Sequence, residues 1–205
     1  MPNLLVAGTS SNGGTAITTD TSGTLNIVTG SGSGSNAITI DASQNVVFSG
    51  NVSGNIKSGT AVASTSGTSI DFTGIPSTAK RITVMFNAVS TSGTSNILIQ
   101  IGSGSVTTSG YVSLAQQAAS GATSTAGFIV TQTITAANNL YGFVGINLIS
   151  GTTYVESGNT GTGGGAVFNS SGGSPALSAA LDRVRITTVN GTDTFDAGSI
   201  NILYE

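Results

Sequence analysis

Apolar side chains recur at every second position from residue 82 onward, with mostly polar side chains between them. The alternating apolar residues are Ile82, Val84, Phe86 and Ala88. Period-two alternation is typical of a β-strand with one buried face, so it predicts a strand over Ile82–Val89. Seven turn-forming residues (90–96) separate it from a second β-rich run, Ile97–Ile101. The pattern predicts that these two strands form a hairpin that opens a β-domain.

Similar short runs, spaced by about ten residues, continue through the rest of the chain. The further strands that we expect are Tyr111–Gln116, Gly127–Ile134, Leu140–Ile149, Thr152–Ser157, Ala166–Asn169, Arg183–Val189 and Ser199–Tyr204. With Gly, Ser and Asn turns between them, they predict an all-β fold, a β-sandwich or jelly roll. The run Leu140–Ile149 is apolar on both faces, which indicates a central strand. We also expect one helical turn over Ser178–Leu181 and a type I′ hairpin at Asn190-Gly191.

An internal repeat lies near the N-terminus, where residues 17–27 align with residues 38–48. Each unit predicts a strand, a turn capped by an aspartate (Asp20 or Asp41) and a second strand. Units this small and this poor in aromatics cannot bury their own apolar faces, so identical chains must supply the missing neighbours. We therefore interpret residues 1–56 as an intertwined β-stalk. Its apolar patch, Leu4, Leu5 and Val6, is expected to dock on a partner. Residues 57–68 are interpreted as a connector or first peripheral strand, and residues 69–205 as the C-terminal β-sandwich head.

Composition excludes several classes of protein. Charged residues make up 6% of the 205, against about a quarter in a typical globular domain, and the net charge is −3. Disorder normally combines low hydropathy with high net charge, and mean hydropathy here is positive. So small a net charge gives no electrostatic case for binding nucleic acid or an anionic membrane. No apolar run is long enough for membrane insertion, and no signal peptide is indicated, so we expect a soluble protein made in a cytoplasm.

Catalytic chemistry has few candidate residues. The sequence has no histidine and no cysteine, and Glu156 is its single charged residue between Ile82 and Leu181. Usual catalytic triads and most transition-metal sites are thereby excluded, and a glycosidase would need two converging carboxylates. Three aspartates near the C-terminus are interpreted as a salt-bridged rim or as turn caps, because arginines lie beside them: Asp182, Asp193 and Asp196. We expect no enzymatic activity, no cofactor and no metal.

Recognition of a surface ligand is the chemistry that remains. Glycan sites use aromatic faces with amide, hydroxyl and backbone groups on loops, and this chain is rich in the last three. The candidate ligand contacts are Tyr111, Tyr154, Glu156, Asn159 and Asn169. Tyr141 is a further aromatic but is interpreted as a core residue. The loops expected to carry the site are residues 102–109, 158–165 and 170–174.

Five segments of the chain carry a resemblance to a known family: residues 1–14, 38–43, 71–76, 80–87 and 93–95. They resemble segments of the fibre and fibre-like virion proteins of tailed bacteriophages, as in phages of cyanobacteria and other aquatic bacteria. The resemblance implies a homotrimeric structural component of the virion, a tail fibre that attaches through Leu4, Leu5 and Val6 and binds host cell-surface polysaccharide through its head. It is equally compatible with a head fibre or capsid decoration protein that stabilises the shell. A polysaccharide-degrading tailspike is a third alternative, disfavoured by the missing carboxylate pairs.

Overall fold

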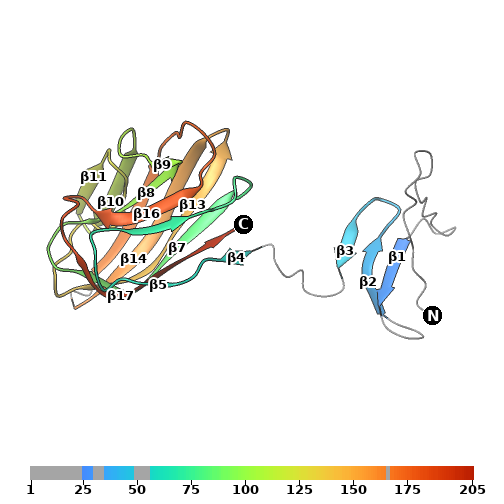
Figure 1. The fold of residues 1–205 in the computed structure, drawn as a ribbon, viewed down its shortest axis with the longest axis horizontal. Coiled ribbons are helices and arrows are strands. Elements are labelled where there is room, and N and C mark those ends of the chain that lie inside the picture. The colour runs from blue at the N-terminus through green and yellow to red at the C-terminus, as the bar shows by residue number, and fades with distance from the viewer. Residues whose placement is uncertain (1–24, 30–34, 49–55, 165–166) are drawn as a thin grey trace. The chain divides into compact units, whose positions relative to one another are not determined.

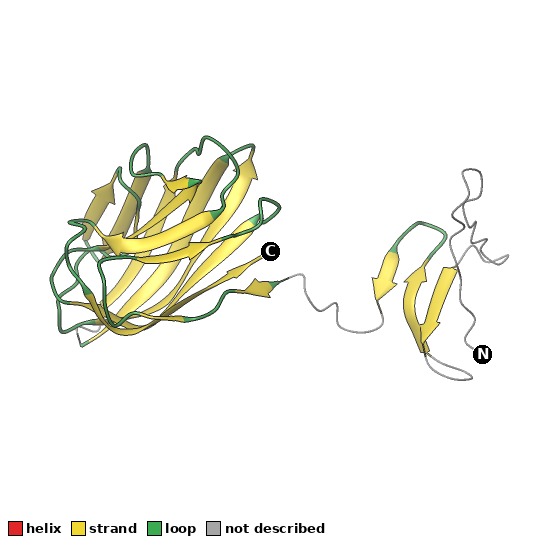
Figure 2. Cartoon of the chain, viewed as in Figure 1, coloured by secondary structure: helices red, strands yellow, loops and turns green. Residues whose placement is uncertain are grey.

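The computed structural model describes residues 25–29, 35–48, 56–164 and 167–205 (Figure 1). The chain divides into two compact units, Met1–Gly54 and Asn55–Glu205. Strands and loops make up everything that is described, which confirms the all-β prediction (Figure 2). The described residues contain no helix that could cross a membrane. The patch Leu4, Leu5 and Val6 lies outside these residues.

The first unit contains a three-stranded antiparallel sheet in the order β1-β2-β3. Its strands are β1 (Leu25–Thr29), β2 (Ser35–Ile40) and β3 (Val46–Phe48). In the turn between β2 and β3, Asp41 Oδ1 accepts hydrogen bonds from the backbone N–H groups of Ser43 and Asn45, both at 2.9 Å. The Asn45 side chain donates to Oδ2, and these bonds lower the pKa of Asp41. The predicted aspartate-capped turn is thus confirmed in the second repeat, while Asp20 of the first lies outside the described residues.

The second unit is a sandwich of two antiparallel sheets (Figure 1). The larger, nine-stranded sheet has the order β11-β10-β15-β14-β13-β7-β17-β4, and β5 also pairs with β17. Its strands are β4 (Lys57–Ser58), β5 (Val62–Ala63), β7 (Arg81–Thr91), β10 (Val112–Gln117), β11 (Ser120–Ser124), β13 (Asn139–Ser150), β14 (Thr153–Gly163), β15 (Val167–Ser174) and β17 (Phe195–Tyr204). The smaller sheet has the order β12-β8-β16-β6, and β9 pairs with β8. Its strands are β6 (Ile70–Thr73), β8 (Ile97–Ser103), β9 (Ser105–Val106), β12 (Phe128–Ile129) and β16 (Arg183–Thr188).

The core lies between the two sheets and is built from alternate residues of each strand. The larger sheet contributes Ile82, Val84, Phe86, Leu140, Val144, Ile146, Ile200 and Ile202, and the smaller contributes Ile97, Ile99, Ile101, Phe128, Val184 and Ile186. All of these side chains are buried, so the period-two pattern located the inner face of β7 correctly from Ile82 to Phe86. It fails at Ala88, which is half-buried, because the strand is bulged there (φ +55°) and Val89 is the buried residue instead. β13 is an interior strand of its sheet, as predicted for Leu140–Ile149.

Both predicted hairpins are wrong, because the chain crosses between sheets at these points. β7 lies in the larger sheet and β8 in the smaller, and the same is true of β17 and β16. The strands of each pair therefore bury their apolar faces in the shared core from opposite sheets. The two crossover segments hydrogen-bond to each other: the backbone N–H of Ser95 donates to Asp193 Oδ2 (2.9 Å), and that of Ser92 to the carbonyl of Thr194 (2.8 Å).

Two expected loops are strands instead. Residues 158–163 belong to β14 and residues 170–174 to β15. Their glycine- and serine-rich composition resembles that of a loop, yet Thr160, Thr162 and Asn169 are buried at alternate positions. In the third expected loop, residues 102–106 form a tight β8–β9 hairpin around Gly104 (φ +71°), and residues 107–109 are a loop as predicted. Position 158 of β14 favours glycine because a Cβ there would collide with Val144, 2.5 Å from its Cγ2.

Other differences concern shorter segments. The strand predicted over Gly127–Ile134 is reduced to β12, and Ser178–Leu181 does not form a helical turn. The apolar pattern did not predict β11, which is a serine- and glycine-rich edge strand. Residues 57–68, interpreted as a connector or first peripheral strand, contribute the edge strands β4 and β5, whose backbone groups pair with β17.

Candidate binding surfaces

Both candidate tyrosines are core residues, so they cannot act as platforms for a surface glycan. Tyr111 is 1% exposed and packs edge-to-face on Phe128, with ring centroids 5.1 Å apart. Its hydroxyl accepts a hydrogen bond from the N–H of Ile101 and donates to the carbonyl of the same residue. Tyr154 is equally buried, and its hydroxyl accepts from the N–H of Leu181. Each tyrosine thus places its ring in the core and satisfies its hydroxyl with backbone groups.

Glu156 and Asn169 are also buried, on the inner face of the larger sheet. Glu156 Oε1 accepts a 2.6 Å hydrogen bond from Ser171 Oγ, whereas Oε2 has no partner. Burial raises the pKa of Glu156 to about 7, although the bond from Ser171 opposes the shift. Asn169 Oδ1 accepts from the N–H of Gln132. Neither residue can contact a ligand at the surface, which corrects their assignment as candidate contacts.

Asn159 alone among the five candidates is exposed. It lies on the outer face of the larger sheet, where Ser170 Oγ donates to its Oδ1 at 2.8 Å. The exposed aromatics are Tyr141, Phe143 and Phe168, which are 43%, 60% and 64% exposed. Along β13, the even-numbered residues Leu140 and Val144 are buried, and the odd-numbered residues 141 and 143 point outward. The alternation of inward and outward positions could therefore have identified Tyr141 and Phe143 as exposed. The interpretation of Tyr141 as a core residue is therefore wrong.

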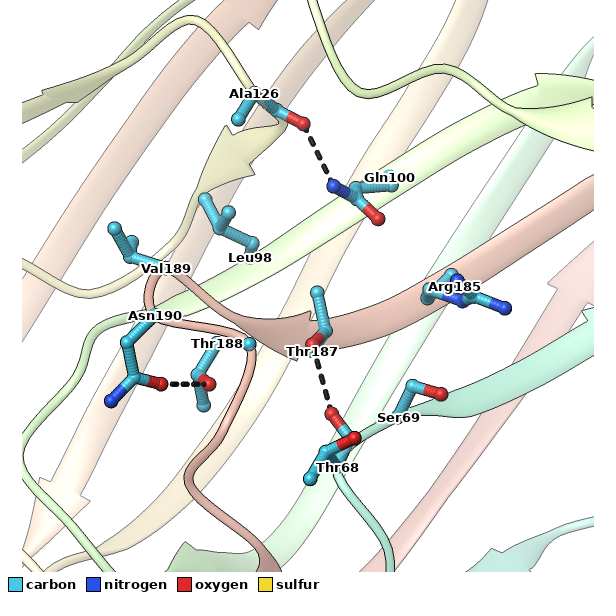
Figure 3. Close-up of a pocket in the computed structure, with 11 residues that line it drawn as sticks. Thr68, Ser69, Leu98, Gln100, Ala126, Arg185, Thr187, Thr188, Val189 and Asn190 are labelled. Atoms are coloured by element: carbon cyan, nitrogen blue, oxygen red, sulfur yellow. Dashed lines mark hydrogen bonds between the residues drawn. The ribbon is translucent and has the colours of Figure 1, made fainter.

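The outer face of the smaller sheet carries a pocket of about 280 Å³ (Figure 3). Gln100 from β8 and Thr187 from β16 form part of its lining, with Ser69 at the start of β6 and Asn190 in the crossover beyond β16. Two hydrogen bonds fix its side chains: Gln100 Nε2 donates to the carbonyl of Ala126 (2.9 Å) and Thr187 Oγ1 to that of Thr68 (2.8 Å). The pocket thus presents hydroxyl and amide groups held by rigid strands.

A second pocket, of about 320 Å³, lies on the same face and shares Arg185 with the first. Arg185 donates to both carboxylate oxygens of Asp71, at 2.7 and 2.9 Å, and the two residues are direct cross-strand partners. Arg183 binds Asp182 in the same way, which lowers the pKa of Asp182. The expected salt-bridged rim is therefore present at Asp182, while Asp193 is a turn cap that accepts from Asn190 and Ser95.

The described residues hold no group of three or more Asp, Glu, His or Cys side chains that could bind a metal ion. No protein-family model matches the chain, and no curated protein or solved structure is significantly similar to it.

Proposed function

We propose that this protein is a structural component of a phage virion, a homotrimeric tail fibre that binds host surface polysaccharide through its C-terminal sandwich. The observation that carries the proposal is the pair of adjoining pockets on the smaller sheet. The first is lined by hydroxyl, amide and guanidinium groups, and the second by hydroxyl groups and by guanidinium groups beside the carboxylate of Asp71. Sugar hydroxyls are both donors and acceptors, so such a lining matches the chemistry of a neutral glycan.

The state of the carboxylates near the pockets favours binding over catalysis. Asp71 and Asp182 each accept two hydrogen bonds from an arginine. A general acid needs a raised pKa, whereas the pKa of Asp182 is lowered by its arginine. Glu156, whose pKa is raised, is buried in the core. These residues accordingly support a non-enzymatic receptor-binding protein.

Filling the first pocket should weaken glycan binding. Ser69 is half-buried in its wall, so an indole at this position in Ser69→Trp would occupy the space that a sugar ring needs. We expect binding to an array of bacterial surface polysaccharides to fall at least ~10-fold, which corresponds to a loss of about 1.4 kcal/mol or more of binding free energy. Ser66→Trp is the matched control, since Ser66 is exposed in the preceding loop and does not line the pocket. Equal binding by the two variants would show that the ligand binds elsewhere.

The place of the protein on the virion is tested by immunogold labelling with an antibody against residues 69–205. We expect gold at the tail tip or baseplate of intact particles. Gold spread over the capsid would replace the tail-fibre proposal with the head fibre or capsid decoration protein. The pockets would then lose their assignment as a receptor site.

A further inference from the structure

The outer face of the larger sheet carries no charged side chain across five adjacent strands. From β11 through β10, β15 and β14 to β13, the chain contains a single charged residue, Glu156, and it points into the core. Charged side chains instead lie on the smaller sheet, at Asp71, Arg183 and Arg185, and on the other strands of the larger sheet, at Lys57, Arg81 and Asp196. The solvated outer face of an antiparallel sheet is normally polar. The combination of no charge and several exposed apolar side chains on this face is therefore unusual.

Apolar side chains are concentrated on this neutral face. Tyr141 and Phe168 are both opposite Gly161 on β14, so one aromatic ring lies on each side of a glycine. Phe143 is opposite Asn159 in the next outward-facing row, and β10 adds Val112 and Leu114, which are 77% and 50% exposed. Exposed aromatics with few charges around them are the composition of a protein–protein interface core.

The dimensions of the face suit such an interface. The five strands have 5, 6, 8, 11 and 12 residues. With a spacing of about 4.8 Å and a rise of about 3.4 Å per residue, they span roughly 690 Å² in projection. Because side chains protrude from the sheet, its solvent-accessible area is larger than this projected area. Stable interfaces bury about 800 Å² per partner, so one face of this sheet approaches what a specific partner requires.

We infer that this neutral face packs against a second copy of the same chain. Copies of a chain with a net charge of −3 repel each other, and a contact made through a face without charged side chains places no like charges close together. A charged partner would instead find complementary groups on the smaller sheet. The inference rests on the homo-oligomer of the proposed function and assigns contacts between copies to the heads, in addition to the stalk.

The absence of cysteine from the sequence gives a direct test in the full chain. Phe168→Cys and Asn159→Cys each place one thiol on the neutral face, and Val189→Cys places one on the pocket side of the smaller sheet. Phe168 and Val189 have similar exposed fractions in the single chain, 64% and 52%, so they form a matched pair. Analytical ultracentrifugation first establishes the oligomeric state, and the rate of maleimide labelling is then measured for each variant.

We expect oligomers in which the thiols at positions 159 and 168 react at least ~10-fold more slowly than the thiol at 189, with the difference lost in denaturant. Oligomers in which all three react at the same rate would overturn the inference while leaving the homo-oligomer intact. A monomeric wild-type protein would overturn both. Because Asn159 is a small exposed residue, its variant tests the inference even if Phe168→Cys fails to fold.

Discussion

Raising the pH from about 4 to 8 is expected to lower the free energy of unfolding by about 3 kcal/mol through Glu156 alone. Its pKa is about 7 in the folded protein, against 4.5 in the unfolded chain, and each unit is worth 1.36 kcal/mol. Since the folded state holds this proton more tightly, the contribution of Glu156 to stability is fully present below pH 4.5 and is lost as pH rises through 7. The sequence has no histidine that would titrate in the same window.

Equilibrium urea denaturation at fixed protein concentration across this pH range measures the effect. Glu156→Gln retains an acceptor for Ser171 and cannot ionise, so its profile should be flat from pH 5 to 8 and its stability at pH 8 higher than that of wild type. Asp193→Asn is the control, because the pKa of Asp193 is lowered and its contribution is lost only as pH falls below about 4. An unchanged slope in Glu156→Gln would show that another group titrates.

Gly198→Ala is expected to destabilise the fold by an amount on the order of 3–5 kcal/mol. Gly198 adopts φ +91° in β17, where the strand is bulged against β7. A Cβ there would collide with the carbonyl of Ala88 and lie 2.6 Å from that of Asn87, and neither backbone group can rotate away. The cost combines unfavourable φ, about 1–2 kcal/mol, with displacement of a central strand pair.

Gly191→Ala separates these two contributions. Gly191 also has positive φ, +67°, but no atom lies within 4 Å of the position a Cβ would take. We expect Gly191→Ala to cost only about 1 kcal/mol in the same denaturation experiment. Similar losses in both variants would mean that backbone conformation alone, without the collision at Ala88, determines the requirement for glycine.

The local pattern of apolar and polar residues predicted where strands occur better than it predicted which strands pair with each other. The alternation that begins at Ile82 identified the inner face of β7, and the apolar run at 140–149 identified an interior strand. Two strands that are consecutive in the sequence can pair within one sheet or lie in the two sheets on either side of the core. Both arrangements give the same alternation of apolar and polar residues. Residues 90–96 and Asn190-Gly191 therefore predicted hairpins where the chain crosses between sheets.

The candidate site was the least predictable part. Tyr111 and Tyr154 were predicted as ligand contacts because glycan sites use aromatic faces, yet both rings are buried and each hydroxyl satisfies a buried backbone group. The pocket on the smaller sheet joins Ser69, Gln100 and Thr187, which are far apart in the chain. Only the pairing of β6, β8 and β16 brings them together, and no local pattern encodes it.

The position of β17 determines when the sandwich can be completed during synthesis. β7 pairs with β13 on one side and with β17 on the other, so one edge of β7 stays open until residues 195–204 leave the ribosome. At about 5–20 residues per second, that is a delay of roughly 5–20 s after β7 emerges. During this interval the chain exposes an unpaired edge and the core positions later covered by Phe195, Ile200 and Ile202. A ribosome that stalls before β17 would therefore release an aggregation-prone chain, and chaperone demand should be concentrated at this late stage of translation.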